Sequence, residues 1–363
     1  MNKVLFFVQL PPPIHGAAVC NQNIVNSKVI AREISVRLLP IKFSNTITEM
    51  QKNGVRKLLK TVPLAIRLIR EIIFNRPKAV YFTISPIGSS FYRDLLFVSI
   101  MKIFGLTIIY HLHGKGIADQ TSRIKQTLYR FTFSNTYLVC LSERLSKDVD
   151  PVKSNAVIFV CPNGVETLDV APSNCTATIE LLFLSNLLPN KGLYEYLNMA
   201  KLLVEKGYDV NINLAGPFNN KFKEADLNRI LTESPDLSNR FMYHGSVAGV
   251  KKWELLERSD ILVHPTRNDA FPLVILEAMA SGCAVVSTDQ GGIPDILEGG
   301  DFGFVVPVGR EEELFESTLR LITDSEKLAE CQKNSKNEYL EKYTMHTFEN
   351  NILEILKKVT RET

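Results

Sequence analysis

Short runs of apolar residues alternate with stretches of helical periodicity along this chain of 363 residues. The first run, 3–10, is apolar at nearly every position, which is typical of a strand buried on both faces of a parallel sheet. Prolines follow it, and a helical pattern begins near Ala17. The same order recurs later, for example as a strand pattern over 106–113 and a helical pattern over 120–133. The alternation predicts doubly wound α/β domains, whose ligands bind at the carboxyl ends of strands.

The length of the chain indicates two such domains, because it exceeds what one hydrophobic core usually supports. We expect residues 1–166 to form a first Rossmann-like domain and 176–344 to form a second. The segment 166–178 between them is polar and lacks periodicity, which is typical of a linker.

The composition is that of an ordinary soluble globular protein, with 45% hydrophobic and 22% charged residues. The first residues do not follow a signal-peptide pattern, and the longest apolar run is broken by Lys102 and Gly105, so no spanning helix is expected. The six cysteines are scattered without C-x-x-C pairs, which favours a reducing compartment. A cytoplasmic location is therefore expected.

Charge is distributed unevenly, with a net +13 over the first 150 residues and −10 over the remainder. This asymmetry favours an anionic surface as a partner of the first half. The stretch 52–78 combines basic residues with apolar residues at helical spacing, and Pro63 is expected to interrupt it. A basic amphipathic helix can lie on an anionic membrane, so we expect peripheral binding to the inner face of the cell membrane. A helix that faces the core and leaves its basic face in solvent is the alternative.

The stretch 269–282 follows a strand-like run and carries the signs of a binding site. Pro272 suits the first turn of a helix and Gly282 its end. The helix N-terminus would face the carboxyl end of a strand and offer unpaired N–H groups to an anion. Asp269 stands just before this anion site, and Glu277 lies further along the helix. Two carboxylates beside an anion site suit a sugar joined to a diphosphate and a ribose, because sugar and ribose both offer hydroxyl donors.

This stretch resembles the E-x7-E signature of the retaining family-4 glycosyltransferases, with Asp269 in place of the first Glu and Gly291-Gly292 following. The resemblance implies that Glu277 binds the nucleotide ribose and that Asp269 binds hydroxyls of the donor sugar. It also implies a GT-B architecture, in which two Rossmann-like domains face each other across a cleft and a terminal helix, 345–363, packs back onto the first.

The activity that the resemblance implies is retaining transfer from a nucleotide-diphosphate sugar, with UDP favoured and GDP possible. The implied acceptor is lipid-linked or a polysaccharide, in a bacterial O-antigen, capsule or exopolysaccharide pathway. No nucleic-acid partner is expected.

Other positions match the family in part. Family members usually read G-R…K-G after the first strand of the second domain; here Lys191-Gly192 matches and Asn186 replaces the Arg. Because the missing Arg removes a bidentate phosphate contact, Lys191 becomes the main cation expected at the leaving group. His113 matches a His-Gly pair found in many family members, whose His touches the donor sugar or the reaction centre. Strand alternation places His111 on the same side as His113.

The resemblance thus gives a set of expected site residues. Those expected to act in catalysis are His113, Asp269 and Lys191. Those expected to bind the donor are Gly16, Asn186, Lys191, His244, Asp269, Ala270, Phe271, Pro272, Leu273 and Glu277.

No metal or cofactor is expected. Asp148-Val149-Asp150 matches the D-x-D metal motif of another glycosyltransferase architecture, but it follows a helix rather than a strand and is interpreted as a chance match. The first loop holds one glycine, so the G-x-G-x-x-G pattern of an NAD enzyme is missing. Lys191 and backbone N–H groups near 270–273 and 291–292 are expected to meet the charge of the leaving group.

Two other functions remain open at the level of the sequence. A nucleotide-sugar epimerase of the same fold would release an isomerised nucleotide sugar without an acceptor. A non-catalytic module that binds sugar nucleotides or lipids would tolerate the missing Arg at position 186 and the change to Asp269.

Overall fold

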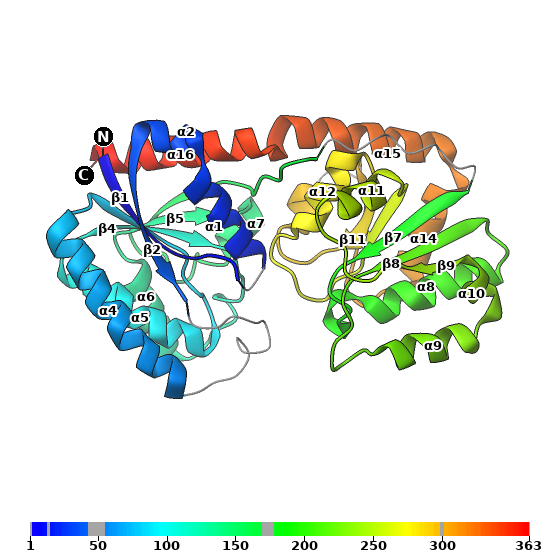
Figure 1. Ribbon diagram of the computed structural model, residues 1–363, viewed down its shortest axis with the longest axis horizontal. Coiled ribbons are helices and arrows are strands. Elements are labelled where there is room, and N and C mark those ends of the chain that lie inside the picture. Colours follow the sequence, from blue (N-terminus) through cyan, green and yellow to red (C-terminus); the bar gives the residue numbers. More distant parts are fainter. Residues whose placement is uncertain (1, 13–14, 43–54, 169–177, 298–300, 363) are drawn as a thin grey trace. The chain divides into compact units, whose positions relative to one another are not determined.

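The computed structural model of the protein describes residues 2–12, 15–42, 55–168, 178–297 and 301–362, with side chains from 61 onward in the helix that begins at Val55. The chain divides into two compact units (Figure 1). The first comprises Met1–Gly164 and Met345–Thr363, and the second comprises Val165–Thr344. Most of the linker predicted over 166–178 lies outside the described residues.

The first unit is built on a parallel sheet of six strands in the order β2-β1-β3-β4-β5-β6. Its strand β1, which lies between β2 and β3, is buried from Val4 to Val8, as the unbroken apolar run predicts for a strand covered on both faces. The strands are β1 (Asn2–Gln9), β2 (Ile34–Ile41), β3 (Ala79–Phe82), β4 (Thr107–Leu112), β5 (Tyr137–Cys140) and β6 (Val157–Val160).

Helices cover both faces of this sheet. They are α1 (Gly16–Asn26), α2 (Lys28–Glu33), α4 (Val55–Asn75), α5 (Gly88–Ile103), α6 (Arg123–Phe133), α7 (Glu143–Lys147) and α16 (Met345–Glu362). The expectation that Pro63 interrupts the basic stretch is wrong, because α4 runs through it without a break. Proline removes one helix hydrogen bond and costs about 3 kcal/mol. Burial of Leu64, Leu68 and Ile72 against the core offsets that cost.

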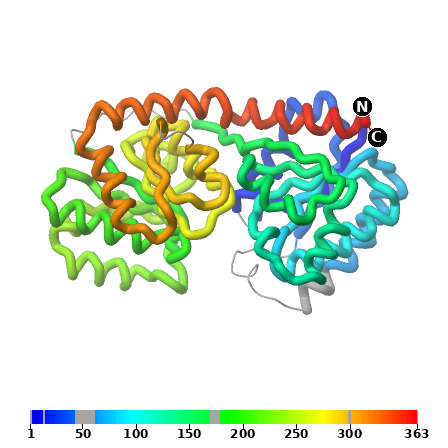
Figure 2. The backbone as a smooth tube through the Cα atoms, turned by 180° about the vertical axis from the view of Figure 1, so that it is seen from behind, coloured from blue at the N-terminus to red at the C-terminus, as the bar shows by residue number. Residues whose placement is uncertain are grey.

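The last helix, α16, supplies part of the core of the first unit. Its Phe348, Ile352 and Leu356 are buried in one apolar cluster with Val4 and Phe6 of β1. The ends of the chain lie together, as Figure 2 shows from behind, and the Asn2 side-chain amide donates a hydrogen bond of 2.9 Å to the hydroxyl of Thr360. The first unit therefore combines the two ends of the sequence.

The second unit repeats the architecture with a parallel sheet in the order β12-β11-β10-β7-β8-β9. The direction of winding reverses between β7 and β10, and ligands of such folds bind beyond the carboxyl ends of strands at this point. The strands are β7 (Ile179–Leu184), β8 (Val210–Ala215), β9 (Phe241–Tyr243), β10 (Ile261–His264), β11 (Ala284–Thr288) and β12 (Gly303–Val306).

The helices of the second unit include the one predicted after residue 269. It is α12, and it begins at Leu273, so that Pro272 is the N-cap rather than a residue of the first turn. The others are the 3-10 helix η1 (Pro189–Lys191), α8 (Leu193–Glu205), α9 (Glu224–Thr232), α10 (Pro235–Arg240), α11 (Val250–Glu257), α13 (Ile293–Ile296), α14 (Glu311–Thr323), α15 (Ser325–Glu338) and the π-helix η3 (Tyr339–Tyr343). Within the described ranges, no helix has the length and apolar character needed to cross a lipid bilayer.

Candidate functional site

Three polar side chains meet at the switch point of the second unit. Lys191 ends η1 in the segment after β7, His264 ends β10, and Asp269 lies in the loop that follows β10. Oδ2 of Asp269 lies 2.5 Å from Nζ of Lys191 and 3.3 Å from Nε2 of His264. The structure thus brings together the predicted leaving-group cation and the predicted sugar-binding carboxylate, and it adds His264, which sequence reasoning missed.

The charge state of Asp269 follows from these neighbours. Burial by itself raises the pKa of this carboxyl, but the hydrogen bonds and charges of His264 and Lys191 outweigh burial and lower the pKa to about 2. Asp269 is therefore ionised at physiological pH and can accept hydrogen bonds from hydroxyl groups. Lys191 places three N–H donors and a positive charge at the same strand ends.

Backbone contacts fix the loop of Lys191 against the loop that carries Asp269. Gly192 adopts a φ of +80°, and a Cβ there would lie 2.0 Å from the carbonyl oxygen of Pro265. Only glycine allows this approach. The N–H of Arg267 donates to the carbonyl oxygen of Asn190 over 3.0 Å, and the Arg267 guanidinium pairs with the carboxylate of Glu195.

Gly291 and Gly292 hold the other side of the Asp269 loop. A Cβ on Gly291, whose φ is +55°, would lie 2.3 Å from the carbonyl oxygen of Ala270. The N–H of Gly292 donates to that same oxygen over 2.7 Å. The N–H of Gly292 was one of the backbone groups expected to meet the charge of the leaving group, and it is already engaged in this hydrogen bond. The glycine pair positions the backbone that carries Asp269.

Glu277, the predicted ribose ligand, is the fifth residue of α12. Its Oε1 lies 2.7 Å from Nζ of Lys252 on the preceding helix α11, and both side chains remain partly exposed. Sequence reasoning missed Lys252, since nothing in the local pattern around either residue marks a partner 25 positions away.

The other residues of the second unit that were predicted to bind the sugar donor differ in their exposure to solvent. Phe271 and Pro272 are buried, and the Phe271 ring contacts Tyr343 with ring centroids 6.5 Å apart. Ala270 and Leu273 are partly exposed, and Asn186 is exposed. The Phe271 side chain therefore packs into its own unit, which leaves its backbone and the neighbouring residues to meet a ligand.

His244 takes part in a separate hydrogen-bond network. Its Nε2 lies 2.8 Å from Oδ1 of Asn213, and the Asn213 amide donates to Glu180 over 2.7 Å. Burial and then the charge of Arg258 lower the pKa of His244. The structure does not bring this imidazole to Lys191 and Asp269; it ties His244 to β8.

In the first unit, His113 lies one residue past the end of β4. The ring centroids of His111 and His113 are 4.0 Å apart, which confirms that both project to the same side of the strand. Burial and then the neighbouring imidazole of His15 lower the pKa of His113 to about 3. The ring is therefore neutral at physiological pH and can hydrogen-bond to a hydroxyl.

Asp148, from the chance match to D-x-D, organises the loop after His113. Its carboxylate accepts hydrogen bonds from the backbone N–H groups of Gly116, Ile117 and Ala118 at 2.9, 3.0 and 2.9 Å. These three hydrogen bonds give Asp148 a structural role that requires no bound ligand. The remaining predicted residue, Gly16, is exposed at the start of α1, where a Cβ would meet no atom within 4 Å.

Comparison with known proteins identifies the second unit. Residues 169–338 match the model of the family described as glycosyl transferases group 1. The second unit of this chain is a group 1 glycosyltransferase domain. The finer assignment to family 4 remains a prediction from the sequence.

A relative that is named as a glycosyltransferase is similar to this chain in sequence. The chain is 26% identical over 230 residues to the phosphatidylinositol N-acetylglucosaminyltransferase gpi3 subunit of Schizosaccharomyces pombe, a match that covers 61% of this chain and 49% of the relative. The chain thus spans about half the length of that relative.

Two solved structures show the same fold. Sucrose-phosphate synthase from Thermosynechococcus elongatus superimposes with a TM-score of 0.77 at 13% identity, over 100% of both chains. HepE from Anabaena in complex with UDP-glucose gives 0.69 at 20% identity, over 98% of this chain and 99% of that one. The predicted fold class, two α/β domains of the GT-B type, is confirmed.

Proposed function

We propose that this chain transfers a sugar from a nucleotide-diphosphate donor, with a UDP-sugar favoured, to a lipid-linked or polysaccharide acceptor with retention of configuration. The observation that carries the proposal is the pair of Lys191 and Asp269, 2.5 Å apart at the switch point of a group 1 domain. Lys191 offers a cation to a diphosphate, and next to it Asp269 offers a carboxylate to sugar hydroxyls.

The chemistry of these side chains matches the parts of such a donor. Lys191 would bind the diphosphate, Asp269 the sugar hydroxyls and Glu277 the ribose hydroxyls. Lys191 pairs with Asp269 and Glu277 pairs with Lys252, so the donor would exchange these ion pairs for its own phosphates and hydroxyls. The complex of HepE, a protein of the same fold, with UDP-glucose supports a UDP-sugar.

In the proposed reaction, an acceptor hydroxyl attacks the anomeric carbon on the face from which the diphosphate departs. The bond between that carbon and the phosphate oxygen breaks as the new glycosidic bond forms, and the departing phosphate takes the proton of the acceptor. Lys191 stabilises the charge that develops on the diphosphate. The neutral imidazole of His113 is proposed to hydrogen-bond to the donor sugar.

The surface of α4 supports a lipid-linked acceptor. Leu64, Leu68 and Ile72 are buried, but a second apolar row of the same helix is exposed. Val62, Ile66 and Ile73 form this row, and Phe74 next to it is 79% exposed. Arg67 and Arg70 are exposed beside it. Apolar side chains next to basic ones suit an anionic membrane surface.

The setting that we propose is peripheral binding at the cytoplasmic face of a membrane. The name of the Schizosaccharomyces pombe relative denotes a phosphatidylinositol acceptor, which supports a lipid-type acceptor here. Synthesis of a bacterial O-antigen, capsule or exopolysaccharide is the pathway proposed from the sequence.

The donor is tested by titrating the purified protein with UDP-, GDP- and ADP-sugars in a calorimeter, followed by transfer of a labelled sugar to a membrane lipid extract. Lys191→Ala should weaken nucleoside-diphosphate binding. Asp269→Asn and His113→Ala should lower kcat while leaving that affinity nearly intact, because they act on the sugar.

Other outcomes would favour the other functions. Release of an isomerised nucleotide sugar without an acceptor would identify an epimerase. Tight donor binding without turnover on the lipid extract or on glycan acceptors would identify a binding module. Equal losses of nucleotide affinity in Lys191→Ala, Asp269→Asn and His113→Ala would contradict the assignment of roles.

A further inference from the structure

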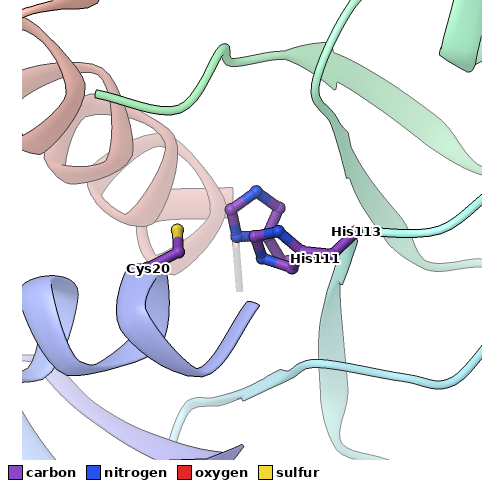
Figure 3. A group of neighbouring side chains, drawn as sticks. All are labelled: Cys20, His111 and His113. Atoms are coloured by element: carbon purple, nitrogen blue, oxygen red, sulfur yellow. The ribbon is translucent and has the colours of Figure 1, made fainter. Parts of the chain in front are cut away.

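Cys20 of α1 and two histidines at the end of β4 form a compact group of soft and borderline ligands. The sulfur of Cys20 and one ring nitrogen each of His111 and His113 lie within 4.8 Å of one another. Figure 3 shows the two imidazoles between β4 and α1, near the thiol. In the part of the chain that the structure describes, this is the one group of three or more His, Cys, Asp or Glu side chains that could hold a metal ion.

Each of the two histidines has a ring nitrogen to spare for a ligand. Within the described residues, Nε2 of His111 and Nε2 of His113 are buried and make no hydrogen bond. A buried polar atom without a partner is costly and rare in folded proteins. Two such atoms on neighbouring rings, beside a buried thiol, indicate a shared partner.

A neighbouring hydroxyl can orient His111 as a ligand. Nδ1 of His111 hydrogen-bonds to the hydroxyl of Tyr81. When Nδ1–H donates to that oxygen, Nε2 keeps its lone pair available to bind an ion. A ring nitrogen held by an outer hydrogen bond while the other binds the ion is the usual arrangement of metal-bound histidine.

We propose that Cys20, His111 and His113 bind a Zn²⁺ ion. Typical bonds of about 2.3 Å to sulfur and about 2.0–2.1 Å to nitrogen place tetrahedral ligand atoms roughly 3.5 Å apart. Because the three atoms already lie within 4.8 Å of one another, small side-chain rotations bring them to this spacing. Cys20 binds as the thiolate and its proton passes to solvent. One thiolate and two imidazoles leave a fourth position for water, and they favour Zn²⁺ over Mg²⁺, Ca²⁺ or Mn²⁺.

The ion would act as an inhibitor of the proposed transfer. A Zn²⁺ bound to His113 withdraws that imidazole from the donor sugar. This consequence rests on the proposed function, whereas the binding of the ion does not.

Binding is tested on the full chain with Zn²⁺ alone by calorimetry, and with Co²⁺ by absorption spectroscopy. The wild type should bind one equivalent, and Co²⁺ should give the visible bands of a tetrahedral site with a thiolate charge-transfer band. Cys20→Ala should weaken Zn²⁺ binding at least tenfold and abolish the charge-transfer band. The control is Cys161→Ala, another buried cysteine of the same core cluster, which should bind like the wild type.

Several results would overturn the site. They are the absence of stoichiometric Zn²⁺ binding by the wild type, unchanged binding by Cys20→Ala, or an equal loss in Cys161→Ala. Circular dichroism of each variant establishes that it is folded, and His111→Gln provides a second ligand variant that should lose binding as Cys20→Ala does.

Inhibition is measured separately. Zn²⁺ should lower turnover of the wild type and a chelator should restore it, whereas Cys20→Ala should keep its turnover and lose the sensitivity. If the wild type binds Zn²⁺ through Cys20 but transfers no sugar, the site stands and the proposed function fails. Turnover that is insensitive to Zn²⁺ while the site is loaded would refute the inhibitory role.

Discussion

Nζ of Lys252 and Oε1 of Glu277 are 2.7 Å apart, and this ion pair joins α11 to the middle of α12. If Glu277 binds the ribose, Glu277→Gln should weaken the binding of UDP by about tenfold or more, because hydrogen bonds to a charged group contribute about 1.5–3 kcal/mol. Titration calorimetry with UDP measures this. Lys252→Met keeps the carboxylate and should cost less affinity than Glu277→Gln. Unchanged UDP affinity in Glu277→Gln would refute the ribose assignment.

Gly291 supports the loop of Asp269, and its substitution should reduce donor affinity. Gly291→Ala would place a Cβ 2.3 Å from the carbonyl oxygen of Ala270 and displace that backbone. Gly207→Ala is the matched control, since Gly207 also has a positive φ, +80°, but a Cβ there meets no atom within 4 Å. The control should cost about 1–2 kcal/mol of stability through strain alone and leave donor binding intact. Equal donor affinities in the two variants would show that the Gly291 contact does not position the site.

The exposed row of α4 should bind anionic membranes. The protein should co-sediment with anionic liposomes at low salt and be released at 1 M salt, where the Debye length falls to about 3 Å. Arg67→Glu with Arg70→Glu should abolish this binding and leave donor binding unchanged. Arg123→Glu with Arg130→Glu makes the same charge change on exposed positions of α6 and should have a smaller effect. Equal partition onto neutral and anionic vesicles, or none onto either, would leave a soluble acceptor as the better interpretation.

The ion pair of Asp269 should make the second unit sensitive to acid. The pKa of this carboxyl is about 2 in the folded protein and 3.8 ordinarily. The ionised Asp269 therefore contributes about 2 kcal/mol to the free energy of unfolding above pH 3.8, and this contribution is lost as the pH falls toward 2. The single tryptophan, Trp253, is buried in the second unit, so its fluorescence reports the unfolding of that unit in urea. Asp269→Asn should lose less stability than the wild type between pH 5 and pH 2.5; an equal loss would contradict the assignment.

The sequence predicted those features that depend on local pattern. Apolar runs identified strands such as β1, and the alternation of side chains along β4 placed His111 and His113 on one side. The glycine after α12 and the glycine pair at 291–292 marked real backbone requirements, with φ values of +80° at Gly282 and +55° at Gly291. These signals are carried by residues close together in the chain.

The partners of the site residues could not be predicted, because they come from distant segments. Lys252 is 25 residues from Glu277, and Lys191 is 78 residues from Asp269. Periodicity also failed for α4, where one apolar pattern contains a buried row and an exposed row. Which row packs on the sheet depends on the neighbouring helix α5 and on the strands, and the pattern itself holds no information about them.

The placement of α16 constrains the order in which the chain can acquire structure during its synthesis. The first unit uses residues from both ends of the sequence, and Phe348, Ile352 and Leu356 complete the core around β1. A ribosome therefore makes all of the second unit before it supplies the last segment of the first. The amino-terminal half remains with an uncovered apolar surface until then, and the second unit, whose residues are continuous from 165 to 344, is the one that can finish folding first.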